Sequence, residues 1–114
     1  MRRGYVSGPM RGYPDCNYPA FMAAAKALRE HGWWVFNPAE MDEARDHEPP
    51  EDGPAAWRHY AKRDTRVLIE LLKAENGDAV VVLPGWGKSV GASAEVALGQ
   101  WVGLKVLTLE EALK

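Results

Sequence analysis

An uninterrupted apolar run over residues 79–83, followed by a glycine-rich loop, constrains the fold of this chain more than any other feature. Continuous valine and leucine between Asp78 and Pro84 is typical of a strand that is buried on both faces, as in parallel sheets covered by helices. Open parallel sheets bind ligands beyond the carboxyl ends of their strands. We therefore expect a ligand site at the loop over residues 85–91.

A helix-like segment follows this loop, and Glu95 is the one acidic residue among its small apolar side chains. Glu95 could be a solvent-facing residue that the helix dipole favours near an N-terminus. However, a helix that is apolar on most sides is usually buried, which favours a functional carboxylate near whatever the loop binds. Backbone amides of the loop and of the first helical turn could hold an anion there.

Composition limits the remaining possibilities. A chain of 114 residues with 46% hydrophobic content can build one compact domain, residues 1–114, with its own core. Its 14 basic and 16 acidic residues give a formal charge of -2, so no strong positive field exists to attract nucleic acid or an anionic membrane. Small anionic ligands must then be held locally.

Cysteine and histidine usage excludes further classes. Cys16 is the single cysteine, so no internal disulfide can form and a reducing compartment fits best. The three histidines are too scattered to predict a metal site. We find neither a membrane-spanning run nor a signal peptide, and expect a cytoplasmic protein that needs no metal or organic cofactor.

The pattern of turn residues and apolar runs predicts strands alternating with helices. We expect strands at residues 4–7, 33–36, 79–83 and 105–107. We expect helices from an Asn17 cap to His31, from Pro54 through Leu72 to a stop at Asn76 and Gly77, over residues 93–102, and after a Thr108 cap. Residues 39–53 are acidic and aperiodic, which predicts a mobile, lid-like loop or simple disorder. This order predicts an α/β domain with a doubly wound, Rossmann-like or flavodoxin-like parallel sheet of four to five strands and helices on both faces.

Candidate site residues follow three of the predicted strands, so the topology should bring them to one cleft. The first loop supplies Ser7, Gly8, Met10, Arg11 and Gly12: two glycines for close backbone approach, a hydroxyl, and an arginine able to grip phosphate. Asn37 follows the second strand, and Trp86, Ser89, Gly91 and Glu95 follow the third. The first loop is not a Walker loop and lacks the Rossmann glycine pattern.

These motifs resemble those of the nucleoside 2-deoxyribosyltransferase superfamily, within it the small DUF4406-type members and the 2'-deoxynucleoside 5'-monophosphate N-glycosidases. The resemblance covers nearly the whole chain. It is carried by the segments at residues 5–12 (YVSGPMRG), 19–21 (PAF), 37–40 (NPAE), 63–64 (RD) and 89–91 (SVG), together with Glu95.

The resemblance implies a role for each matched position. Glu95 aligns with the nucleophile that attacks the anomeric carbon, Asp64 with the acid that assists departure of the base, and Tyr5 with the phenol beside the nucleophile. Ser7, Arg11, Gly12, Ser89 and Gly91 align with the region that receives the 5'-phosphate. The implied activity is cleavage or transfer of the N-glycosidic bond of a 2'-deoxyribonucleotide by a homodimer or higher homo-oligomer.

Plainer alternatives exist for several of these residues. Asp64 lies between Arg63 and Arg66 and could form a solvated ion pair, Tyr5 could pack in the core, and Ser89 could be a helix cap. Trp86 could stack on a base, or it could make a core or dimer contact.

Two features depart from the family pattern. Transferases of the family often carry an aspartate near the position of Ser89, and a hydroxyl there suits phosphate better. No equivalent is found here of the serine that the monophosphate enzymes take from a neighbouring subunit. Two other functions are therefore kept open: a nucleotide-binding or sensor module without turnover, and a transferase acting on free nucleosides. A partner-binding protein with a tryptophan interface is a further alternative.

Overall fold

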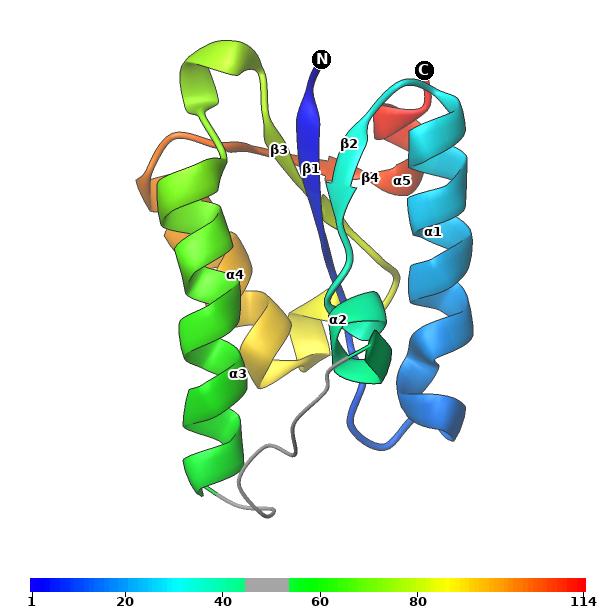
Figure 1. Ribbon diagram of the computed structural model, residues 1–114, viewed down its shortest axis with the longest axis vertical. Helices are drawn as coiled ribbons and strands as arrows, with labels where there is room; N and C mark the ends of the chain where they lie inside the picture. The colour runs from blue at the N-terminus through cyan, green and yellow to red at the C-terminus, as the bar shows by residue number, and fades with distance from the viewer. Residues whose placement is uncertain (45–53) are drawn as a thin grey trace.

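Four parallel strands form one sheet in the computed structural model of the chain, which describes the backbone of residues 1–44 and 54–114 (Figure 1). Side chains are described for residues 1–42 and 58–114. The strand order is β2-β1-β3-β4, with β1 at Arg3–Ser7, β2 at Trp34–Phe36, β3 at Ala79–Val82 and β4 at Lys105–Thr108. The chain first moves outward from β1 to β2 and then returns to the other side of β1. This reversal is the doubly wound topology expected from the sequence, and ligands bind at such a switch point.

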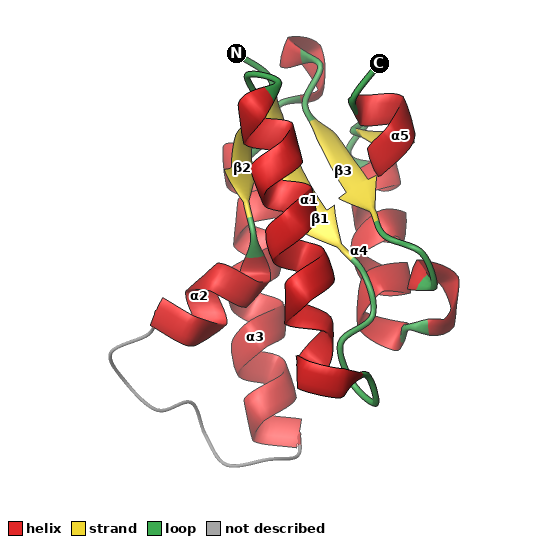
Figure 2. Cartoon of the chain, turned by 90° about the vertical axis from the view of Figure 1, so that its right-hand side faces the viewer, coloured by secondary structure: helices red, strands yellow, loops and turns green. Residues whose placement is uncertain are grey.

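Helices cover both faces of the sheet, as predicted. One face packs against α1 (Tyr18–Glu30) and α5 (Leu109–Ala112). The other packs against α4 (Val90–Trp101) and the helical turn Val67–Leu71 that follows α3 (Pro54–Arg66). Figure 2 shows α1 lying along the near face, with α3 and α4 behind the sheet. The central strand β3 is fully buried, because helices cover it on both sides.

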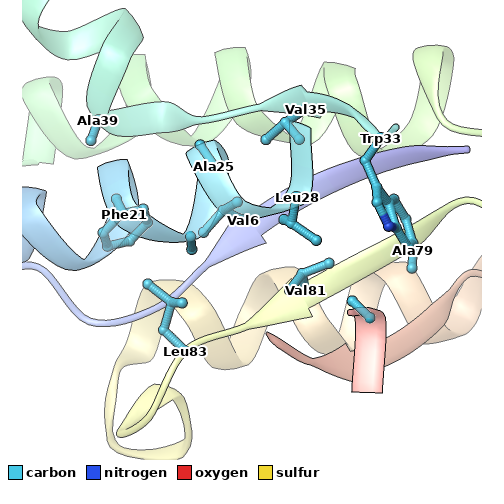
Figure 3. Close-up of a cluster of buried hydrophobic side chains, with 12 residues drawn as sticks. Val6, Phe21, Ala25, Leu28, Trp33, Val35, Ala39, Ala79, Val81 and Leu83 are labelled. Carbon is cyan, nitrogen blue, oxygen red and sulfur yellow. The ribbon is translucent and has the colours of Figure 1, made fainter. Parts of the chain in front are cut away.

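Side chains along β1 and β3 alternate between the two faces of the sheet, so the protein has two separate hydrophobic cores. Val6 and Val81 point toward α1, where they meet Phe21 and Leu28 (Figure 3). Their neighbours along the strands point the other way, so the second core contains Tyr5, Val80 and Val82 together with Leu68, Leu72, Val96 and Leu104. Because successive strand residues face opposite sides, Tyr5 and Ser7 both face α4. This alternation places both hydroxyl groups on the face where α4 packs.

The prediction of a loop over residues 39–53 is wrong at its start. Residues Pro38–Ala44 form helix α2, which begins with proline at its first turn and Asn37 before it. The Asn37 side-chain oxygen accepts a hydrogen bond from the amide of Ala39 at 3.0 Å, which caps the helix. The remainder of that predicted loop, residues 45–53, lies outside the described residues.

Three other boundaries also differ from expectation. The helix that starts at Pro54 continues as a π-helical turn over Val67–Leu71 and ends there, because Leu72 is extended; Gly77, in the left-handed region, instead closes a separate 3-10 turn, Ala74–Asn76. Asn17 does not cap α1 with its side chain, which donates to the carbonyl of Pro9 at 2.9 Å. Helix α4 begins at Val90, three residues earlier than expected, since Ser89 caps it. The predicted Thr108 cap is confirmed as a capping box.

Candidate functional site

A buried carboxylate on α4 is held by two hydroxyl groups from β1. The Tyr5 phenol donates to Glu95 Oε2 at 2.5 Å, and Ser7 Oγ donates to Oε1 at 2.7 Å. Tyr5 and Ser7 are completely buried, so both donors are fixed by the sheet. Glu95 lies in the second turn of α4, which Ser89 caps. Both oxygens of the carboxylate are thereby oriented by neighbouring residues.

The surroundings of Glu95 bring its titration close to neutral pH. Burial raises the pKa of Glu95 to about 7, the hydrogen bonds from Tyr5 and Ser7 oppose this rise, and the negative charge of Asp64 adds to it. Burial and the negative charges of Glu95 and Asp64 raise the pKa of Tyr5 well above its ordinary value. Tyr5 therefore remains protonated, and a hydrogen-bond donor, at neutral pH.

Asp64 on α3 is brought close to this pair. The residue is only 8% exposed, and its carboxylate accepts from Arg63 Nε at 2.8 Å, while Arg63 Nη1 donates to Asp42 on α2 at 2.7 Å. Burial raises the pKa of Asp64, and Arg63 and a hydrogen bond with Tyr5 oppose the rise. Asp64 does form an ion pair with Arg63, but the pair is largely buried and not solvated as the alternative expected. The Tyr5 phenol thus interacts with both carboxylates.

A pocket of about 690 Å³ opens above Glu95 at the carboxyl edge of the sheet. The loop after β1, the loop after β3 and the first turns of α4 form its walls. Of the residues proposed from the sequence, it includes Gly8, Met10, Arg11, Ser89, Gly91 and Glu95. The sequence prediction that strand ends would converge on one cleft therefore holds for the β1 and β3 ends.

The pocket lining is basic. It contains Arg11 and Lys88, with Glu95 as the only acidic group among the described residues that line it. Ser89 Oγ accepts from the amide of Ala92 at 3.2 Å, so Ser89 is the helix cap and also a pocket residue. The N-terminal turn of α4, with its free amides and positive dipole end, faces the same space. Such a lining suits an anionic ligand.

A comparison with family models shows to which family the chain belongs. The model for the domain of unknown function DUF4406 matches residues 2–108. The chain belongs to the DUF4406 family. No curated protein and no solved structure matches the chain. The matched segment contains every candidate residue of the site described above.

Four residues of the DUF4406 chain that the sequence suggested for binding do not line the pocket. Asn37 is 2% exposed and is occupied by the cap of α2 and by a 3.3 Å bond to the carbonyl of Phe21. Trp86 packs against the second hydrophobic core, which agrees with the alternative of a core residue. Ser7 lies beneath the pocket and touches Glu95 instead. Gly12 is in the left-handed region, with open space where a side chain would begin.

Lys88 and Tyr13 line the pocket and were missed. The position of Lys88 was a usable signal, since a basic residue directly before a helix N-terminus is suited to anions. Nothing in the sequence pointed to Tyr13, because only the fold brings the loop after β1 beside the loop after β3. The Tyr13 hydroxyl lies 2.7 Å from the position that a Cβ atom at Gly85 would occupy. Gly85 has a positive φ of 87°, so glycine is required there for both reasons.

A second hollow of about 650 Å³ in the DUF4406 domain lies at the opposite, amino edge of the sheet, near Arg3, Lys73 and Asp78. Asp78 there accepts from the amides of Arg3 and Lys73 at 2.8 and 2.7 Å and from the Asn76 side chain at 2.8 Å. These contacts tie neighbouring segments together and occupy the carboxylate. Among the residues that the structure describes, no helix is long and apolar enough to cross a membrane. The same residues contain no group of three or more side chains placed to bind a metal ion.

Proposed function

We propose that this DUF4406 domain cleaves the N-glycosidic bond of a 2'-deoxyribonucleoside 5'-monophosphate through a covalent intermediate on Glu95. One observation carries the proposal: a buried carboxylate, held by two hydroxyl donors, forms the floor of a pocket with basic walls. The motif resemblance to the nucleoside 2-deoxyribosyltransferase superfamily supports the same assignment.

The residue types match the steps of such a reaction. The ionised Glu95 carboxylate attacks the anomeric carbon; the carbon–nitrogen bond breaks, and its electron pair leaves with the base, which takes a proton from Asp64. Water then attacks the same carbon and gives its proton to Asp64, while the ester bond breaks and returns Glu95 as a carboxylate. A second base in place of water would give transfer instead of hydrolysis.

The two carboxylates need different protonation states for these roles. Burial raises the pKa of both Glu95 and Asp64, and the negative charge of Asp64 further raises the pKa of Glu95. The proposed reaction needs the proton on Asp64 and the negative charge on Glu95. Tyr5 interacts with both groups and in this proposal orients Glu95, while Ser7 fixes its other oxygen.

The 5'-phosphate is assigned to Arg11, Lys88 and the first turn of α4. An arginine can bind two phosphate oxygens at once, and a lysine adds a point charge. The overall charge of -2 gives no general attraction for anions, so this local pair has to supply it. The pocket volume of about 690 Å³ suits a small molecule.

The direct test incubates purified protein with the four common 2'-deoxynucleoside 5'-monophosphates and their nucleosides, and separates free base by chromatography. We expect base release from monophosphates that is abolished in Glu95→Gln. The matched control is Glu70→Gln, an exposed glutamate on the turn after α3. Base release that persists in Glu95→Gln would overturn the assignment of the nucleophile.

One observation favours a second candidate, a nucleotide-binding module without turnover. A pKa of about 7 leaves much of Glu95 protonated at neutral pH, where it is a hydrogen-bond donor and a poor nucleophile. This candidate predicts saturable monophosphate binding by calorimetry with no base released at high protein concentration. Base release with a nucleoside donor only when an acceptor base is added would instead indicate a transferase.

A further inference from the structure

Arg63 is shared by two carboxylates. Its Nε donates to Asp64 at 2.8 Å and its Nη1 donates to Asp42 at 2.7 Å. The side chains of Asp42, Arg63 and Asp64 are 10%, 23% and 11% exposed, so water screens the three charges poorly. The Arg63 guanidinium also lies over the ring of Tyr60, 5.3 Å from its centroid, which helps to hold it in place. One largely buried cation therefore serves two largely buried anions.

Arg63 by itself works against the role proposed for Asp64. Burial raises the pKa of Asp64, but the hydrogen bond and the charge of Arg63 lower it. A group that gives a proton to a leaving base has to hold that proton first. With Asp42 present, a proton taken up by Asp64 leaves one positive and one negative charge in the cluster. Without Asp42, the same proton would leave Arg63 with no counter-charge in a poorly solvated position.

We propose that Asp42 is a positioning residue for Asp64: it binds the Arg63 guanidinium and balances its charge, so that Asp64 can take up and release a proton. This role rests on the function proposed above and adds a third carboxylate to it. Asp42 is not among the residues that line the pocket. It therefore acts on the substrate only through Arg63 and Asp64.

Asp42 has a hydrogen-bond donor for each of its oxygens. Arg63 donates to Oδ1, and the hydroxyl of Tyr18, at the start of α1, donates to Oδ2 at 3.2 Å. Burial and the charge of Asp42 raise the pKa of Tyr18 to about 12, so this hydroxyl keeps its proton at neutral pH. Burial lowers the pKa of Arg63, but its contacts with the two carboxylates raise it further, so Arg63 stays charged. A carboxylate with a donor on each oxygen can carry its charge in a buried position.

Asp64 faces charged or titratable groups from four elements. They are Arg63 on α3, Asp42 on α2, Tyr5 on β1 and Glu95 on α4. Burial and the charge of Asp42 raise the pKa of Asp64, whereas Arg63 and the hydrogen bond with Tyr5 lower it. A substitution at Asp42 removes one influence that raises this pKa and leaves the other three groups in place. The substitution therefore measures what Asp42 does for Asp64.

Carbon NMR titration of the Asp64 carboxyl in wild type and in Asp42→Asn tests this role, with Asp64→Asn used to assign the signal. Asparagine keeps the shape of aspartate: its carbonyl oxygen can accept from Arg63 and its amide can donate to the Tyr18 hydroxyl, so the charge is what is lost. We expect the pKa of Asp64 to fall by about one unit. The same fall is expected in Asp42→Ser, which keeps the test available if Asp42→Asn does not fold.

Glu40→Gln is the matched control for the titration. It removes the same charge from the same helix, but Glu40 pairs with Arg29 in an exposed position, so the pKa of Asp64 should stay as in wild type. Asp42→Glu keeps the charge and should also keep most of the elevated pKa. Circular dichroism checks that each variant is folded. An unchanged Asp64 pKa in Asp42→Asn and Asp42→Ser would overturn the proposal.

The same variants test the role of Asp42 in the reaction. At pH 7, kcat for base release should fall about tenfold in Asp42→Asn, because Asp64 carries its proton in a correspondingly smaller fraction of molecules. KM for the monophosphate should change little, since Asp42 does not reach the pocket, and Asp42→Glu should recover most of the rate. A lowered Asp64 pKa with an unchanged kcat would overturn the positioning role. A wild type that releases no base would instead overturn the proposed function, and the titration would still decide whether Asp42 controls the proton on Asp64.

Discussion

The Tyr5 phenol on β1 and the Glu95 carboxylate on α4 form a 2.5 Å hydrogen bond between residues 90 positions apart in the chain. The Tyr5 ring is completely buried and stacks on Phe36 with 5.5 Å between ring centroids, which fixes the direction of the hydroxyl. Glu95 thus depends on the central sheet both for its position and for its protonation. The hydrogen bond is the link between fold and proposed chemistry.

Replacing Tyr5 with phenylalanine should shift the titration of Glu95 upward. The hydrogen bond from Tyr5 lowers the pKa of Glu95, so its loss should raise that pKa from about 7 by roughly one further unit. Carbon NMR titration of the Glu95 carboxyl measures this directly, and the acidic limb of the pH profile for base release should move the same way. Tyr60→Phe, which keeps the ring beside Arg63, is the control. An unchanged pKa in Tyr5→Phe would contradict the proposed contact.

Glu95→Gln should make the protein more stable at alkaline pH. The pKa of Glu95 rises from 4.5 to about 7 on folding, so the unfolded chain loses this proton first as pH rises. The wild type should therefore lose roughly 3 kcal/mol of unfolding free energy between pH 4.5 and pH 8, with the change complete above the folded pKa. Glu95→Gln lacks this loss. Urea unfolding of both proteins at pH 4.5 and pH 8 measures the difference.

The exposed Glu70→Gln variant is the control for that experiment, and its stability relative to wild type should change little with pH. A Glu95→Gln variant that is equally stable relative to wild type at both pH values would show that Glu95 ionises as freely in the folded state as in the unfolded chain. A gain in stability with a loss of activity is the usual relationship for a strained functional group.

Removing Arg11 or Lys88 should weaken binding of monophosphates and leave binding of nucleosides nearly unchanged. Each basic group lines the pocket, and the loss of one charged phosphate contact should reduce affinity about tenfold. Titration calorimetry with a monophosphate and its nucleoside gives the comparison. Lys105→Gln, at the start of β4 on the opposite edge of the sheet, should behave as wild type. Equal losses for both ligands would remove the phosphate assignment.

Burial on both faces explains why much of the fold was predictable. A strand covered on both sides must be apolar throughout, so the run at Ala79–Val82 was visible, and so were the glycine and proline punctuation around the helices. Helix α2 was missed because residues 38–44 are short and acidic. Its start depends on the buried Asn37, whose side-chain amide donates to the distant carbonyl of Phe21.

The site was predictable where local pattern carried the information. Glu95 stood out as a single charge in an apolar helix, whereas Tyr5 was expected beside it only from the family resemblance. The structure adds that Tyr5 and Ser7 lie on one face of β1. The contact between Arg63 and Asp42 was not visible in this way. Asp42 lies 21 residues earlier in the chain, and only the packing of α2 beside α3 brings the two together.

The buried position of Arg63 leads to a last prediction, a marked loss of stability in Arg63→Met. Arg63 bridges Asp42 and Asp64, whose side chains are 10% and 11% exposed, so its removal leaves two poorly solvated carboxylates without their cation. We expect a loss of about 2 to 4 kcal/mol in urea unfolding at pH 7. The control is Arg29→Met, because the Arg29–Glu40 pair is 44% and 38% exposed and should contribute less than about 1 kcal/mol. The loss in Arg63→Met should shrink at acidic pH, because burial raises the pKa of Asp64 and its protonation removes a charge that Arg63 balances. Equal small losses in both variants would mean that water reaches the Arg63 cluster as freely as it reaches the surface pair.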